Sequence, residues 1–162
     1  MPRITISYSK DDGETWTDYE SSSSEINVGI IVQSGDVVLF KGDNARYCIN
    51  IGPDRYYSFS GTTARFNIKG NIMSLINSSE FETISTLSRA YTFYHIFESC
   101  TGLTSAEHLI LPAITLTSWC YTGMFAGCTS LTTAPILYAT NLADYCYSNM
   151  FQDCASLTKA PE

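Results

Sequence analysis

Residues 120–145 read CYTGMFAGCTSLTTAPILYATNLADY, and residues 146–161 begin the pattern again as CYSNMFQDCASLTKAP. Identical residues that stand 26 positions apart include Cys120 and Cys146, Phe125 and Phe151, and Leu131 and Leu157. A fixed period of about 20–29 residues with leucines at set positions is typical of leucine-rich repeats. The pattern therefore predicts a solenoid in which each repeat supplies one short strand and one short helix.

A degenerate copy of the repeat precedes this stretch. Its residues match those of the next repeat at an offset of 28 as far as Leu103, and at an offset of 26 from Leu111 onward. A two-residue insertion near Glu107-His108 accounts for the change. We therefore expect three repeats in the second half of the chain, namely 93–119, 120–145 and the incomplete 146–162.

Within a repeat, the strand and the helix can be placed from the pattern. The segment Leu131–Leu137 is the predicted strand, although Ala134-Pro135 weakens it because proline donates no backbone hydrogen bond. The segment Cys146–Gln152 is the predicted helix, because its apolar residues stand three and four positions apart. The fold class predicted from these units is mixed α/β.

The first half of the chain has the pattern of a β domain. Short apolar segments alternate with Gly, Asn, Asp and Pro at spacings of about 8–12 residues, which is typical of an antiparallel sandwich or partly open barrel. The predicted strands are 4–8, 26–32, 37–41, 47–51, 56–60 and 64–68, with 17–24 as an exposed loop or a poorly ordered edge. We expect this domain to span 1–75. A junction at 76–92 should cap the first repeat, with helical spacing of apolar residues in 72–76 and 85–97.

Residues 9–16, SKDDGETW, fit the Asp-box pattern S-x-D-x-G-x-x-W. A single copy predicts a turn rather than an active site. We expect Asp11 to accept hydrogen bonds from backbone N–H groups, Gly13 to adopt a positive φ, and Trp16 to pack back on the hairpin. Four acidic residues that could bind Ca²⁺, namely Asp11, Asp12, Asp18 and Glu20, lack the spacing of an EF-hand. A solvated acidic turn is therefore favoured over a Ca²⁺ site.

Composition excludes several classes of function. The formal charge is −7 and no cluster of Lys and Arg occurs, which argues against nucleic-acid binding. Charged residues make up 15% of the chain, against about 25% in typical domains, and Ser, Thr and Tyr supply the polar surface instead. No run of about 18 apolar residues predicts a membrane span. No secretion leader is visible, so we expect it to be absent or removed.

The motif CYxxMFxGCTSLTTAP resembles the BspA-like leucine-rich repeats of Bacteroidetes surface proteins. The matching residues are 120–137 and 146–161, with the degenerate copy from 93. The first half resembles the β domain that precedes such repeats, through residues 8–16 and 70–75. The resemblance implies a non-enzymatic binding or adhesion protein at the cell surface or outside the cell. Phages of the same hosts carry similar modules, so a virion structural or host-attachment protein is the alternative.

Six cysteines follow the repeat rather than the spacing of zinc sites. We expect free, buried thiols stacked between neighbouring repeats, with disulfides in an oxidising compartment as the alternative. The two histidines, His95 and His108, have no partner at ligand spacing and are expected at the surface or in a capping position. We therefore expect no metal, no cofactor and no catalytic residue, although a glycan-active enzyme stays open as an unfavoured alternative.

Tyr121 and Tyr147 recur at the same position of the repeat. Stacked aromatic rings could bind a sugar, but packing in the core with the hydroxyl at the surface is the favoured interpretation. The leading function is recognition of a protein or glycan by the strand face of the repeats or by loops of the β domain. We also expect a homo-oligomer through the open end at 146–162. The predicted core is Trp16, Phe40, Phe66, Leu75, Phe97, Leu103, Phe125, Leu131, Leu137, Phe151 and Leu157.

Overall fold

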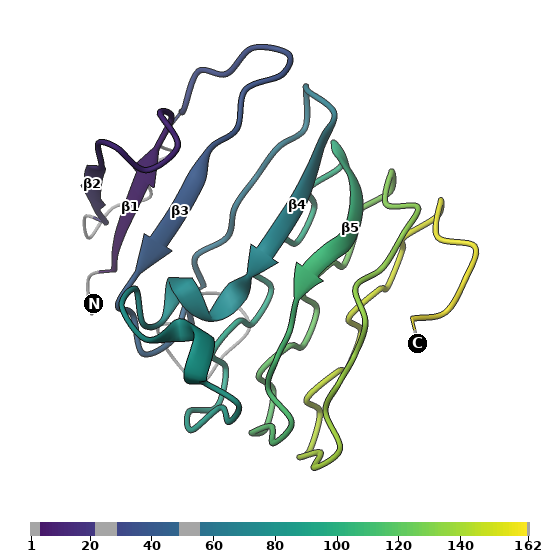
Figure 1. Cartoon of the computed structure of the whole chain (residues 1–162). Helices are drawn as coiled ribbons and strands as arrows, with labels where there is room; N and C mark the ends of the chain where they lie inside the picture. The colour runs from purple at the N-terminus through teal and green to yellow at the C-terminus, as the bar shows by residue number, and fades with distance from the viewer. Residues whose placement is uncertain (1–3, 22–28, 49–55, 162) are drawn as a thin grey trace.

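The structure is a computed structural model that describes residues 4–21, 29–48 and 56–161 (Figure 1). An antiparallel sheet in the order β2-β1-β3 and a parallel pair β4-β5 are its regular elements. Two short 3₁₀ helices, η1 and η2, follow β4. The bounds are β1 Thr5–Ser9, β2 Thr17–Glu20, β3 Leu39–Gly42, β4 Phe66–Asn71, η1 Ile72–Leu75, η2 Phe81–Thr83 and β5 Leu103–Ile110.

The predicted fold class, an antiparallel sandwich-like domain followed by a mixed α/β solenoid, is wrong. The described residues contain no α-helix, and their strands form only one three-stranded and one two-stranded sheet. No unit of strand plus helix recurs among them. The predicted strand 131–137 is reduced to an isolated bridge between Ser105 and Thr133, and the predicted helix 146–152 is a run of turns.

Three of the six strands predicted for the first half of the chain are present in the structure. Strands at 4–8, 37–41 and 64–68 are confirmed with shifted ends as β1, β3 and β4. The segment 56–60 forms only a bridge from Tyr56 to Cys48, and 29–32 is irregular. Residues 26–28 and 49–51 lie outside the described residues. The segment 17–24, expected as an exposed loop or a poorly ordered edge, contains β2, which pairs with β1 at the edge of the sheet. Residues 22–24 lie outside the described residues.

Left-handed residues at every fourth position explain why no helix forms in the repeats. We call residues 91–99, 119–127 and 145–153 the first, second and third turn ribbons. Their left-handed residues have φ between 54° and 73° and are Tyr91, His95, Ser99, Trp119, Gly123, Gly127, Tyr145, Asn149 and Asp153. Since an α-helix requires right-handed φ throughout, each of these residues interrupts it and closes a tight turn. Apolar residues spaced three and four positions apart therefore occur in turn ribbons as well as in helices, and for this reason the helix prediction is wrong.

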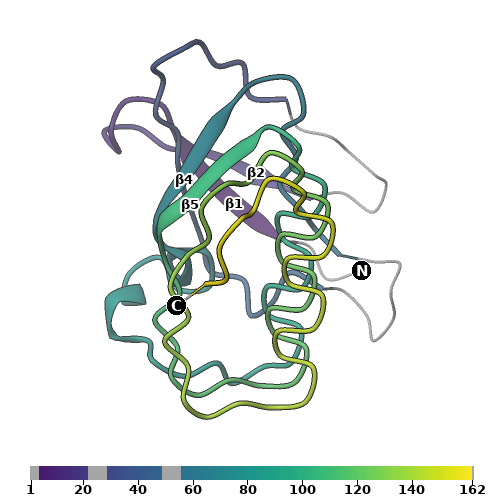
Figure 2. The same cartoon turned by 90° about the vertical axis from the view of Figure 1, so that its right-hand side faces the viewer.

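Backbone hydrogen bonds join each ribbon to the next. In the first ribbon the N–H of Phe93 donates to the carbonyl of Cys120 at 2.9 Å, and in the second the N–H of Tyr121 donates to Cys146 at 2.9 Å. Intervening N–H groups close turns inside their own ribbon, as Met124 does to Tyr121 at 3.2 Å. The ribbons consequently lie one upon another, and they overlap when viewed along the stack (Figure 2).

Aromatic rings stack between the ribbons and form the centre of the core. Phe93, Tyr121 and Tyr147 make one column, with 5.8 Å between successive ring centroids. A second column, with spacings of 5.7 and 5.5 Å, contains Phe97, Phe125 and Phe151. Parallel offset stacking contributes about 0.5–1.5 kcal/mol per pair beyond area burial.

The first half of the chain covers the beginning of both columns. The ring centroids of Tyr47 and Phe93 are 6.3 Å apart, and those of Phe59 and Phe97 are 5.6 Å apart. The rings of each pair are stacked. The backbone N–H groups of Tyr47 and Phe59 donate at 2.8 Å to carbonyls of the first ribbon. One hydrophobic cluster thus runs from Ile4 into the third ribbon. The predicted domain boundary at residue 75 stays a prediction.

Most of the predicted core is present in that cluster. Leu75, Phe97, Leu103, Phe125 and Leu131 are buried. Five others are partly buried against them, namely Phe40, Phe66, Leu137, Phe151 and Leu157. Trp16 is the exception. It lies outside the cluster, half-buried on the Asp-box turn, because its indole N–H donates to the Gly13 carbonyl at 3.0 Å and Lys41 lies 3.9 Å above its ring.

All six cysteines are buried. Three of them form a column in which each thiol donates to a carbonyl of the preceding layer: Cys100 to Phe59, Cys128 to Phe97 and Cys154 to Phe125. Burial raises the pKa of Cys128 to about 12, which keeps the thiol protonated and unreactive. Neither 3₁₀ helix of the described residues has the length or apolar character to cross a bilayer.

The Asp-box turn forms as predicted. Asp11 accepts hydrogen bonds from the backbone N–H of Thr15 at 2.9 Å and from the Ser9 hydroxyl at 2.7 Å, and Gly13 has φ +90°. These hydrogen bonds lower the pKa of Asp11 from 3.8 to about 2, the Ser9 bond most strongly. The lowered pKa means that the ionised carboxylate stabilises the folded turn.

A pH titration tests this turn. Because the folded pKa is the lower one, the stabilisation from Asp11 should be complete above pH about 4 and should be lost as pH falls through about 2. Carboxyl carbon NMR should give a midpoint near 2 for Asp11. Asp11→Asn should remove this part of the acid dependence of unfolding, whereas Glu14→Gln in the same turn should keep it. An unshifted midpoint would contradict the hydrogen-bonded turn.

A glycine substitution tests the ribbon geometry. Gly123 has φ +58°, and a Cβ there would lie 2.4 Å from His95 Cε1. Left-handed strain and the clash together should lower the free energy of unfolding of Gly123→Ala by roughly 2–4 kcal/mol. Gly127→Ala is the matched control, since its φ is +73° but its nearest contact is 3.3 Å. It should lose only roughly 1–2 kcal/mol in denaturant titration; equal losses would rule out the clash.

Candidate functional site

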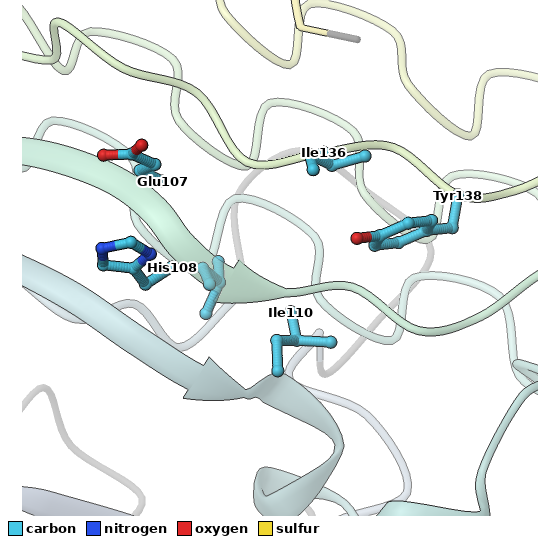
Figure 3. Close-up of a pocket in the computed structure, with 6 residues that line it drawn as sticks. Glu107, His108, Ile110, Ile136 and Tyr138 are labelled. Carbon is cyan, nitrogen blue, oxygen red and sulfur yellow. The ribbon is translucent and has the colours of Figure 1, made fainter.

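The second half of the chain exposes several large hydrophobic side chains. Six such residues, each at least 44% exposed, are Ile110, Ile114, Ile136, Tyr138, Leu142 and Tyr145. Ile110, Ile136 and Tyr138 line a shallow depression of about 300 Å³. Glu107 and His108 lie at one end of it and Tyr138 at the other, with the two isoleucines between them (Figure 3). We call this depression the strand-face site.

Two extra residues in β5 shape the site. Phe66 pairs with Leu103 at one end of the ladder, and Asn71 pairs with Ile110 at the other. Between these pairs β5 contains two more residues than β4, and the register shifts accordingly. The predicted insertion near Glu107 is therefore absorbed as bulges. Bulges break the alternation of a strand and re-aim side chains, often beside functional sites. Here they leave the consecutive residues Glu107 and His108 both exposed, while Leu109 stays buried.

The backbone behind the site is well supported. Thr132 donates its N–H to the Thr104 carbonyl at 2.9 Å, and Ala106 donates to Thr133 at 2.9 Å. These bonds fix the segment after Leu131 against β5. Ile136 then follows Ile110 by 26 residues, which places the two side chains on the same depression. The site is therefore a fixed surface built from two neighbouring layers.

The chemistry of the strand-face site suits contact rather than catalysis. Its middle is aliphatic, and its polar groups are one carboxylate, one imidazole and the Tyr138 hydroxyl. Glycoside hydrolysis uses two carboxylates about 5–10 Å apart, and the lining contains only Glu107. Among the described residues, no group of three or more His, Cys, Asp or Glu side chains is arranged to hold a metal ion.

A second polar cluster lies on the first ribbon. His95 Nδ1 is 3.0 Å from Glu98 Oε1 without the alignment of a hydrogen bond, and Tyr56 donates its hydroxyl to the other carboxylate oxygen. Burial lowers the pKa of His95 and raises that of Glu98. The imidazole lies over Gly123 and 5.0 Å from the Tyr56 ring. These contacts pack the first ribbon against Tyr56 and the second ribbon.

The two histidines are thus in different settings. His108 is exposed at the strand-face site, as expected for a surface position. His95 is half-buried and paired with the carboxylate three residues later, a partner that the sequence analysis did not consider.

The predicted ligand residues Tyr121 and Tyr147 belong to one ring column, Tyr121 in its middle and Tyr147 as its last described ring. Tyr121 is fully buried between Phe93 and Tyr147, and its hydroxyl has no hydrogen-bond partner among the described residues. Burial raises its pKa well above the usual value and raises that of Tyr147 to about 12. A sugar would need an open ring face, and Tyr121 has none. For Tyr121 the geometry therefore favours the packing interpretation, although its hydroxyl is not at the surface.

Sequence reasoning missed two exposed features. The strand-face residues Ile110 and Ile136 were related by the 26-residue offset, but the sequence did not show that they point outward. A third aromatic column was also overlooked. It contains Tyr91, Trp119 and Tyr145, with nearly parallel rings 5.9 and 4.2 Å apart. The same offsets of 28 and 26 would have revealed it.

Scans against protein-family models, curated proteins and solved structures found no match. The resemblance to BspA-like repeats therefore rests on the residues of the repeats and stays a prediction.

A pair of tyrosine substitutions tests the burial of Tyr121. Tyr121→Phe removes a buried hydroxyl that lacks a partner, so the free energy of unfolding should rise by about 1 kcal/mol. Tyr47→Phe is the control, because its hydroxyl donates to the Leu75 carbonyl at 2.8 Å and accepts from Asn44. It should lose about 1 kcal/mol in denaturant titration. A loss at Tyr121 would show that its hydroxyl is paired or exposed.

Proposed function

We propose that this protein is a non-enzymatic binding module that recognises a protein ligand through the strand-face site. The observation that carries the proposal is the exposed group Ile110, Ile136 and Tyr138 on one depression. Clustered apolar side chains rimmed by polar groups mark interaction sites on soluble proteins. An aromatic anchor beside aliphatic residues is also the composition of interface centres.

A protein ligand fits this surface better than a glycan. Sugar binding generally uses the open face of an aromatic ring with several polar groups around it. The strand-face site has one tyrosine, which lies at one end, and its middle is formed by two isoleucines. Glu107 and His108 at its end would orient a ligand by hydrogen bonding, which supplies specificity more than affinity.

The setting proposed for this binding is the cell surface or the extracellular space. The low share of charged residues, 15%, and the surface rich in hydroxyl groups support it, as does the resemblance of the repeats to BspA-like surface proteins. Self-association through 146–162 receives no support from the strand-face site, which lies on another part of the repeats.

An array of host-cell surface proteins and glycans, probed with the intact chain, tests the proposal. Saturable binding to a protein is expected, and Ile136→Glu should weaken it at least tenfold because a charge would replace the centre of the contact. Ile31→Glu is the matched control, since Ile31 is 85% exposed and lies away from the site; its binding should be unchanged. Binding only to glycans, or equal loss in both variants, would contradict the strand-face site.

A further inference from the structure

A second depression, of about 320 Å³, shares no lining residue with the strand-face site. It lies between Ala45, the residues Ile76 and Asn77 directly after η1, and residues of the segment 84–92. Its volume is at the small end of the range of about 300–1,000 Å³ that ligand pockets have. We call it the Arg89 depression. Its size suits a small ligand or the end of a chain.

Hydrogen bonds to the next layer hold the segment 84–92 in place. The N–H of Leu87 donates to the Thr115 carbonyl at 3.0 Å. The Arg89 carbonyl accepts the hydroxyl groups of Thr92 and Thr117, both at 2.6 Å. The backbone that carries the Arg89 side chain is therefore fixed from two sides, and the depression exists before any ligand arrives.

The amide of Asn77 is oriented by its own turn. Its Oδ1 accepts from the N–H groups of Ser79 and Glu80, at 3.2 and 2.9 Å, and from the Ser79 hydroxyl at 3.1 Å. Since only the oxygen of an amide accepts, these bonds decide which atom is nitrogen. Nδ2 has no acceptor among the described residues. The Asn77 amide therefore has donors available to a ligand in the depression.

The other polar groups of the lining also lack partners. Thr86, Ser88 and Arg89 are exposed, and within the described part of the chain their side chains make no hydrogen bond or ion pair. Arg89 is the only charged residue among the described residues that line the depression. Guanidinium and amide nitrogens only donate hydrogen bonds. An unpaired guanidinium beside further donors favours an anion, and its planar fork matches a carboxylate.

Apolar residues complete the lining. Leu87 is 2% exposed, and Ile76 and Ile84 are partly buried against the core. They lie deeper than the exposed Arg89 and would contact an apolar part of the ligand. An inorganic anion has no such part. A sugar ring would find no aromatic face, because none of the described lining residues is aromatic. The combination fits an aliphatic group that ends in a carboxylate.

We propose that the Arg89 depression binds an aliphatic carboxylate, as presented by a peptide C-terminus with an apolar last residue or by a free branched acid. Arg89 forms the paired hydrogen bonds to the carboxylate, and Asn77 and Ser88 donate to it. The aliphatic group lies against Leu87 and the two isoleucines of the lining. This proposal does not depend on the strand-face site.

An NMR titration of the intact chain tests the proposal with three probes at up to millimolar concentration. The first probe is the peptide Gly-Ser-Gly-Leu with a free C-terminus, which should shift the N–H signals of Asn77, Ser88 and Arg89 saturably. Its C-terminal amide should not. The third probe, 4-methylpentanoate, separates the two sources. Tighter binding of the peptide assigns the depression to C-termini, and equal or tighter binding of 4-methylpentanoate assigns it to free acids.

Substitutions make the test specific to the depression. Arg89→Gln should weaken binding of the carboxylate at least tenfold, because it removes the paired hydrogen bonds and the charge. Arg65→Gln is the matched control, since Arg65 is also exposed but does not line the depression; its affinity should be unchanged. Asn77→Asp keeps an oxygen acceptor for the turn but adds a negative charge, so it should weaken binding as well.

Circular dichroism and thermal unfolding of each variant check that the fold is retained. Equal affinity for the peptide acid and its amide would overturn the proposal. So would the absence of saturable shifts with both carboxylates, or equal losses in Arg89→Gln and Arg65→Gln.

Discussion

The second half of this protein depends on backbone hydrogen bonds that leave alternate residues of one turn ribbon and enter the next. Odd-numbered N–H groups of 91–99 and 119–127 are used in this way, while intervening groups close turns within their own ribbon. Nearly every buried backbone group must find a partner. A ribbon of this kind cannot satisfy its N–H groups alone, as a helix can, so each one requires a neighbour.

This requirement joins the two halves of the chain. The first ribbon has an acceptor side, and the first half of the chain supplies its partners through Tyr47 and Phe59. The same two residues place their rings over Phe93 and Phe97. The ladder between β4 and β5 adds a second connection. The core is therefore continuous through both halves of the chain. The bulges of β5 lie over this packed core.

The wrong helix prediction has a specific physical cause. Apolar residues at Tyr147, Met150 and Phe151 are spaced as on one face of a helix. Tyr145, Asn149 and Asp153 have positive φ instead, and the chain turns at each of them. Gly123, Gly127, Asn149 and Asp153 are residue types that tolerate this conformation, so the signal was present. Tyr91, Trp119 and Tyr145 are not such types, and stacking on one another holds them there.

The sequence by itself determined the period of the repeats, the place of the two-residue insertion, the Asp-box turn and most of the core. These follow from residue identity and spacing, which are local properties. Only the tertiary structure decided that the period produces turn ribbons instead of helices, that Tyr121 is enclosed, and that Ile110 and Ile136 point outward. Side-chain direction in the repeats depends on bonds between residues 25 to 28 apart, because a neighbouring layer, and not the local sequence, satisfies the backbone.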